Sequence, residues 1–127
     1  MTNQTVQFIP DSDSASISSD VAIFNGLIHT TQIPLRVDGT REMGSIAEQS
    51  RCTLQALKAA LEKVGSGLSQ VLHLTIYLTD MAERAAFNEV YKEFFSPPWP
   101  VRAAIGVAAL GTEGMKVEVT AVAALVR

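Results

Sequence analysis

The chain has 127 residues, enough for one domain with a real hydrophobic core, so we expect a single domain over residues 1–127. Its formal net charge is −3 and its ten Lys and Arg residues form no cluster, which argues against a nucleic-acid partner. Hydrophobic residues make up 47% of the chain and charged residues only 18%. This balance predicts that part of the surface is buried against other copies of the chain.

Membrane and disulfide-rich classes are also disfavoured. No apolar run has the length of a membrane span, and residues 1–5 are polar, unlike a signal peptide. Cys52 is the only cysteine, which excludes an internal disulfide and a thiolate metal cage. We therefore expect a cytoplasmic protein with no membrane partner.

The first elements are predicted to be strands. A short apolar segment at residues 6–9 is followed by candidate strands at 21–24 and 27–32. Asn25 and Gly26 separate these two strands, and an Asn-Gly pair is the strongest short signal for a two-residue hairpin turn.

A helix is predicted to follow Ser45. Ser45 and Glu48 have the spacing of a capping box, in which each side chain bonds the other residue's backbone N–H. Gly65 is the expected stop of this helix. Apolar residues recur between them at helical spacing: Ile46, Leu54, Leu57, Leu61 and Val64.

The remaining elements alternate between strand and helix. Residues 71–79 alternate with a period of two, and Leu72, Leu74, Ile76 and Leu78 are predicted to share one face. Asp80 and Glu83 again suggest a capping box, opening a helix that contains Phe87, Val90, Tyr91 and Phe94. Strands at 101–107 and 116–125 complete the order β-β-α-β-α-β-β, and the segment at 6–9 is a candidate short strand before it. The prediction is an α+β fold with both helices on one face of the sheet.

The opposite face of this sheet is predicted to lack a cover. It carries Val71, Thr75, Tyr77 and Val122, a set too apolar for open water, and two helices cannot cover both faces. We therefore expect self-association through this face. Glu118 is predicted to lie on it.

Isolated reactive residues offer little chemistry. His29 and His73 have no Cys or Glu at metal-ligand spacing, so packed or interface roles are favoured over metal binding. Cys52 is interpreted as a small buried hydrophobic residue. Asn88, within the second predicted helix, is either an exposed surface residue or a functional one.

Arg102 is the most informative charged residue. It begins an apolar strand directly after a turn stiffened by Pro97, Pro98 and Pro100. Its neighbours in sequence carry no opposite charge, and its planar guanidinium group can form two parallel hydrogen bonds to a carboxylate. Arg102 therefore either pairs with Glu118 in a structural ion pair, with the two on neighbouring terminal strands, or binds an anionic ligand.

The chain resembles the reactive intermediate deaminase family (RidA, also called YjgF-like) over nearly its whole length. Small insertions or deletions near Ser96 and Gly111 interrupt the match. The segments that carry the resemblance are Gln32-Ile33-Pro34, Leu74-Thr75-Ile76-Tyr77-Leu78-Thr79-Asp80-Met81, Phe87-Asn88-Glu89-Val90-Tyr91-Lys92-Glu93-Phe94-Phe95, Pro100-Val101-Arg102 and Lys116-Val117-Glu118-Val119.

The resemblance implies a fold, an assembly and an activity. The fold is chorismate-mutase-like α+β, and the assembly is a homotrimer with a barrel-like core and three clefts between subunits. The activity is hydrolysis of enamines and imines, such as 2-aminoacrylate and 2-iminopropanoate, to 2-keto acids and ammonia, without a metal or any other cofactor. The alternative is a trimer that only binds a keto acid or amino acid and does not turn it over.

Site residues follow from the same resemblance. The family's substrate-binding arginine falls on Arg102, its water-positioning glutamate on Glu118 and its helix asparagine on Asn88. A serine hydroxyl of the family falls on Thr30, which keeps the hydroxyl.

Four positions depart from the family pattern. Thr31 replaces a glycine, and Ile17 aligns near a pocket tyrosine. Ala103 and Ala104 replace small polar residues after the arginine. The carboxylate anchor is therefore expected to be retained within a remodelled pocket wall.

Overall fold

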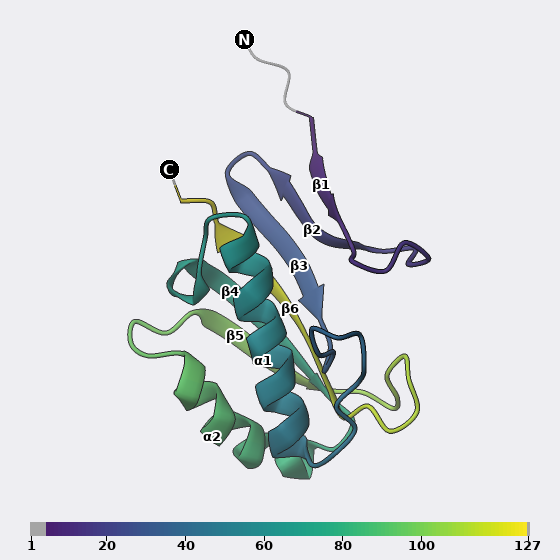
Figure 1. Cartoon of the computed structure of the whole chain (residues 1–127). Helices are drawn as coiled ribbons and strands as arrows, with labels where there is room; N and C mark the ends of the chain where they lie inside the picture. Colours follow the sequence, from purple (N-terminus) through teal and green to yellow (C-terminus); the bar gives the residue numbers. More distant parts are fainter. Residues whose placement is uncertain (1–4, 127) are drawn as a thin grey trace.

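The structure, a computed structural model, describes residues 5–126, so most of the polar N-terminal segment considered above lies outside the described residues. Six strands form one mixed sheet, and two helices lie on the same side of it (Figure 1). The strand order is β1 (Gln7–Pro10), β2 (Ser19–Phe24), β3 (Leu27–Gln32), β6 (Val117–Ala124), β4 (Val71–Leu78) and β5 (Val101–Gly106). The helices are α1 (Ile46–Lys63) and α2 (Arg84–Phe94), with 3₁₀ turns η1 (Leu68–Gln70) and η2 (Met81–Glu83).

The predicted hairpin is confirmed. β2 and β3 pair antiparallel and are joined by Asn25 and Gly26, whose φ angles are 54° and 78°. Positive φ at both central residues matches the right-handed twist of the flanking strands. The turn fixes the register Phe24–Leu27, and this register decides which face each later side chain of β3 occupies.

The capping box of α1 is also confirmed. The Ser45 hydroxyl accepts from the Glu48 backbone N–H at 3.2 Å, and the Glu48 carboxylate accepts from the Ser45 N–H at 3.0 Å. The backbone hydrogen bond from Ser45 is the main reason that the pKa of Glu48 lies below its usual value. At the other end, Gly65 has φ +82° and donates its N–H to the Glu62 carbonyl at 3.0 Å.

The core lies between the helices and one face of the sheet. Leu54, Leu57 and Leu61 of α1 are fully buried, as are Phe87 of α2 and Val117, Val119 and Ala123 of β6. The two helices are also linked at the surface, where Arg51 donates two hydrogen bonds to Glu93 at 2.9 and 2.6 Å. The prediction that both helices cover one face is therefore confirmed.

One predicted face is wrong at its first residue. The register of β4 against β6 shifts between Val71 and His73. This β-bulge reverses the alternation, so that Val71 is buried while Leu72 is 47% exposed. Val71 belongs to the core and not to the uncovered face, and Leu72 does not point into the core.

The predicted capping box of the second helix is also wrong. Asp80 accepts from the Ala82 N–H at 3.0 Å and therefore caps η2, whereas α2 begins at Arg84 without a side-chain cap. The Glu83 carboxylate instead lies 3.7 Å from the Lys116 ammonium, next to the start of β6.

The left-handed backbone at Gly65 gives a test of the α1 terminus. Gly65→Ala is expected to lower the free energy of unfolding by about 1–2 kcal/mol, because a Cβ disfavours positive φ although it would touch nothing there. Gly67→Ala is the control, since Gly67 is extended and its Cβ position is equally open. Urea unfolding at one protein concentration measures both variants. Equal losses for the two would contradict a conformational role for Gly65.

Candidate functional site

Arg102 lies at the edge of the sheet, on the face that the helices cover. β5 is the edge strand and pairs parallel with β4, where Arg102 stands beside Leu74. Leu74 is fully buried beneath the helices, and partners in register point to the same face. The Arg102 side chain therefore extends along this face toward α2, and it stays partly exposed.

Three residues of α2 hold the guanidinium. Its Cζ atom lies 4.5 Å from the centre of the Tyr91 ring and 5.9 Å from that of Phe87, within the range of cation–π attraction. Its Nη2 atom donates to the Asn88 carboxamide oxygen at 2.6 Å. Phe87, Asn88 and Tyr91 follow at helical spacing and therefore face Arg102 together. Asn88 is thus an orienting partner of Arg102 and not an isolated surface residue.

The charge of Arg102 has no carboxylate partner in the part of the chain that the structure describes. The ion pairs among residues 5–126 involve other cations, and no Asp or Glu in that range lies within ion-pair distance of the guanidinium. Of its five N–H donors, one is used by Asn88. The structural ion pair with Glu118 does not form within this chain, and the guanidinium keeps further N–H donors that an anion could accept from.

Glu118 lies on the opposite face. It stands beside Tyr77 in the β4–β6 pairing, between Val117 and Val119, which are both fully buried under the helices. The expectation that β5 and β6 are neighbours is wrong, because β4 lies between them. Since Arg102 and Glu118 lie on opposite faces of one sheet, a site that contains both needs two copies of the chain.

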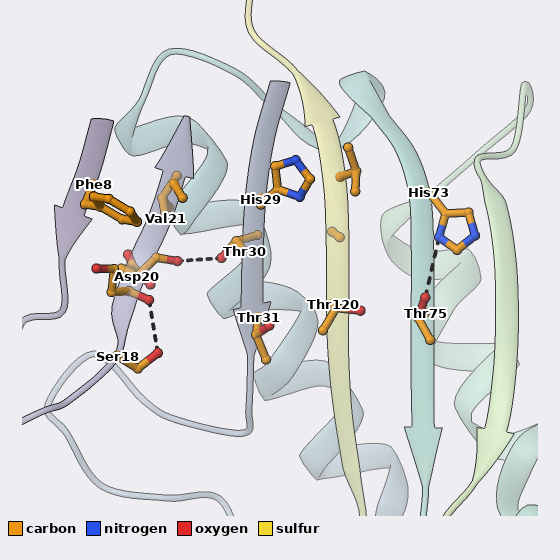
Figure 2. A pocket seen from close by; sticks show the side chains of 14 residues that line it. Phe8, Ser18, Asp20, Val21, His29, Thr30, Thr31, His73, Thr75 and Thr120 are labelled. Atoms are coloured by element: carbon orange, nitrogen blue, oxygen red, sulfur yellow. Dashed lines mark hydrogen bonds between the residues drawn. The ribbon is translucent and has the colours of Figure 1, made fainter. Parts of the chain in front are cut away.

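The uncovered face is hollowed in its middle (Figure 2). The hollow has a volume of about 450 Å³ and lies over β2, β3, β6 and β4. Thr31, Thr120 and Thr75 stand side by side across three of these strands. Ala103 of β5 extends this row next to Thr75. A row of three hydroxyls therefore crosses the face that carries Glu118.

Two histidines line the same hollow. His29 and His73 stand on either side of Val122, and the His73 Nδ1 atom lies 3.5 Å from the Thr75 hydroxyl. Within residues 5–126 no group of three or more His, Cys, Asp or Glu side chains is arranged to hold a metal ion.

Thr30 lies differently from what the resemblance implied. It is only 6% exposed and points to the helix-covered face. Its hydroxyl donates to the Asp20 carbonyl at 2.7 Å and accepts from the Gln32 carboxamide at 2.9 Å. Within one chain its hydroxyl therefore cannot act beside Glu118. The adjacent hydroxyl of Thr31 lies on the same face as Glu118, as strand alternation from the hairpin turn would have indicated.

The other pocket residues are divided between surfaces. Ile17 is fully exposed in the loop between β1 and β2. Ala104 stands beside the buried Ile76 on the helix-covered face, whereas Ala103 lies on the uncovered face. Cys52 lies in α1 and is only partly buried, less than the small buried residue expected from the sequence, and this partial burial raises the pKa of its thiol. The structure therefore brings together Arg102 and Asn88, and separately Glu118, Thr31 and Ala103.

Sequence reasoning missed the role of Phe87 and Tyr91 at the site. Both were interpreted as core residues of the second helix, and both are buried. The signal available was their spacing around Asn88, which places all three on the face of α2 that meets Arg102.

These features define a class of protein: an α+β domain with one uncovered sheet face and, at the sheet edge, an arginine without a carboxylate partner in the described part of the chain. The chain belongs to the Endoribonuclease L-PSP family, whose model matches residues 13–125. It is 38% identical to the mitochondrial protein mmf2 of Schizosaccharomyces pombe over 101 residues, which are 78% of this chain and 80% of that protein.

Solved structures agree with the family and the fold. The yeast protein YEO7 matches with a TM-score of 0.86 and 35% identity, covering 94% of this chain and 98% of the other. A Rid-family protein of Yersinia pestis, YyfA, matches with a TM-score of 0.87 and 25% identity over 94% and 99% of the two chains. The expected membership of the RidA/YjgF-like proteins and the expected α+β fold are therefore confirmed.

The described part of the chain contains no helix that is both long and apolar enough to cross a membrane.

The two neighbouring threonines of β3 give a test of the site geometry. Thr30→Val is expected to lower the free energy of unfolding by about 1–3 kcal/mol, because it leaves the buried Asp20 carbonyl and Gln32 carboxamide short of a partner. Thr31→Val, on the uncovered face, is the matched control and should change stability by less than about 0.5 kcal/mol. Thermal and urea unfolding compare the two. A larger loss of stability in Thr31→Val than in Thr30→Val would contradict the placement of the Thr30 hydroxyl on the helix-covered face.

Proposed function

We propose that this protein hydrolyses small imines and enamines that carry a carboxylate, giving a 2-keto acid and ammonia. The observation that carries this proposal is the guanidinium of Arg102, which is oriented by two aromatic rings and a carboxamide but has no carboxylate partner in the described chain. A charge held in place and left unpaired is the arrangement expected of an anion-binding site. The family resemblance supplies the class of substrate.

Assembly supplies the second half of the site. We propose a homotrimer in which the β5 edge of one subunit packs against the uncovered face of the next, so that Arg102 meets Glu118 of the partner subunit. An edge meeting a face is a heterologous contact, and such contacts close into rings. Large apolar residues exposed on the uncovered face support this packing: Phe8, Phe24, Leu27, Val101 and Ile105.

The reaction then needs only positioning. Arg102 binds the substrate carboxylate in two places and brings the imine carbon next to a water molecule. Glu118 of the partner subunit accepts a hydrogen bond from that water, whose oxygen adds to the imine carbon while one of its protons goes to the nitrogen, giving a carbinolamine. The carbinolamine hydroxyl then passes its proton to the nitrogen as the carbon–nitrogen bond breaks, so that nitrogen leaves as ammonia and the keto group forms. An iminium carbon is already electrophilic, so no covalent intermediate with the protein is required.

A binding protein without turnover is the second candidate. The observation that favours it is the Thr30 hydroxyl, which is used within its own subunit and is not available to activate water. The relatives' family name also includes endoribonuclease activity. We do not propose endoribonuclease activity, because the net charge is −3 and the basic residues are scattered, so they form no positively charged surface for RNA.

For location we propose the cytoplasm, as the single cysteine indicates. Three relatives carry the word mitochondrial in their names, so fluorescence microscopy of the full chain with a C-terminal tag should distinguish the two compartments.

Arg102 gives the first test of this function. Arg102→Ala is expected to abolish ammonia release above the spontaneous rate, and Arg102→Lys to fail nearly as badly, because a point charge cannot replace the planar fork. The assay uses amino-acid oxidases that generate different imines in place. Circular dichroism controls for folding, and intact activity in Arg102→Ala would overturn the proposed mechanism. Calorimetric titration with pyruvate distinguishes an enzyme from a protein that binds without turnover.

The shared site gives a second and stricter test. Arg102→Ala and Glu118→Gln are each expected to lower turnover by about 10²-fold or more when assembled alone. In trimers refolded from an equal mixture, about a quarter of the sites would take Arg102 from one variant and Glu118 from the other, so activity should return to about a quarter of the wild-type value. Mixed trimers without recovered activity would show that the site is not shared in this way. A fully active Glu118→Gln homotrimer would remove Glu118 from the mechanism.

A further inference from the structure

The hydroxyl of Tyr91 is buried without an acceptor for its proton. Tyr91 is 4% exposed, and neither its hydroxyl nor that of Ser50 has a hydrogen-bond acceptor among residues 5–126. A buried hydroxyl almost always has a partner, because leaving it unpaired costs the energy of removing it from water. The Tyr91 hydroxyl therefore needs a physical explanation.

Tyr91 is fixed beside Arg102. The guanidinium lies over its ring at 4.5 Å, and the ring stacks on Phe95 at 4.7 Å between centres and on Trp99 at 5.8 Å. Contacts with a cation and two aromatic rings prevent the tyrosine from turning its hydroxyl toward another acceptor. Its orientation is thus set before any ligand arrives.

The hydroxyl also remains a donor at neutral pH. Burial raises the pKa of Tyr91 above its usual value, and the opposing effects of the Arg102 charge and of a side-chain hydrogen bond from Arg102 to the phenol oxygen are smaller. A protonated phenol next to a guanidinium cannot find its acceptor in that cation, since arginine carries donors alone. The missing partner must be an acceptor that comes to Arg102.

We propose that the Tyr91 hydroxyl donates a hydrogen bond to the carboxylate that Arg102 binds, so that Tyr91 is a substrate-binding residue for 2-oxo and 2-imino monocarboxylates. The inference rests on the proposed anion site at Arg102 but not on turnover. A carboxylate has two oxygens with about four acceptor positions, which can take both the arginine fork and the phenol. The unpaired fork and the unpaired hydroxyl are then satisfied by one ligand.

The proposal predicts that Tyr91→Phe has opposite effects on the stability of the free protein and on its affinity for a carboxylate ligand. Tyr91→Phe keeps the ring beneath Arg102 and removes only the unpaired hydroxyl, so the free protein should be as stable as the wild type or more stable. Affinity for pyruvate, measured by calorimetry on the assembled protein, should fall about tenfold, the expected loss of a hydrogen bond to a charged group. Affinity for pyruvamide, which lacks the charge, should change much less.

Two control variants sharpen the test. Ser50→Ala removes the other unpaired hydroxyl, which lies in α1, and should leave pyruvate affinity unchanged. Tyr91→Leu removes the ring as well and should weaken pyruvate binding beyond the effect of Tyr91→Phe.

The outcomes separate this inference from the proposed function. A change in pyruvate affinity of less than twofold in Tyr91→Phe would overturn the role of the hydroxyl and leave Tyr91 as a support for Arg102. A wild-type protein that binds no monocarboxylate would overturn the anion site and this inference together. Tight binding without ammonia release would overturn the deaminase alone, and the Tyr91→Phe comparison would still decide the present proposal.

Discussion

The side-chain alternation of one sheet is the constraint on which the rest of the structure depends. Both helices cover the same face, so each strand has one buried side and one open side. Arg102 takes the register of Leu74 and lies on the covered side, whereas Glu118 takes the register of Tyr77 and lies on the open side. A shift of one residue in β5 would turn the guanidinium away from α2. The position of Arg102 and its separation from Glu118 within one chain therefore have the same origin, and the proposed site that contains both needs a second subunit.

Local signals made much of the fold predictable from the sequence. The Asn25-Gly26 turn and the Ser45–Glu48 capping box depend on residues close in the chain, and the structure confirms both. The capping box predicted at Asp80 and Glu83 is a local error, whereas two other errors concern interactions between distant segments. The bulge after Val71 exists only in the pairing of β4 with β6, and the position of β4 between β5 and β6 follows from the packing of the whole sheet. Neither is encoded in the neighbouring residues.

The charged residues of the candidate site could be predicted from the sequence, but the aromatic residues that surround Arg102 could not. A proline-stiffened arginine beside apolar residues stands out in a sequence with few charges, and a glutamate on the face expected to be open does so as well. Phe87 and Tyr91 do not stand out, because aromatic residues at helical spacing are typical of a hydrophobic core. In this fold they are core residues that also orient Arg102. Such a double role becomes visible once the strand opposite the helix is known.

The free chain therefore holds two unsatisfied groups side by side, and this arrangement has an energetic consequence. An unpaired buried hydroxyl costs about 1–3 kcal/mol, and a guanidinium that is partly removed from water without an anion adds to that cost. The core of α1, α2 and the covered sheet face has to offset both. A ligand carboxylate that satisfies them recovers this energy on binding, and it pays little for ordering because stacking already fixes Tyr91 and Arg102. The same rigidity that makes the empty site costly thus favours a small, planar anion over a larger flexible one.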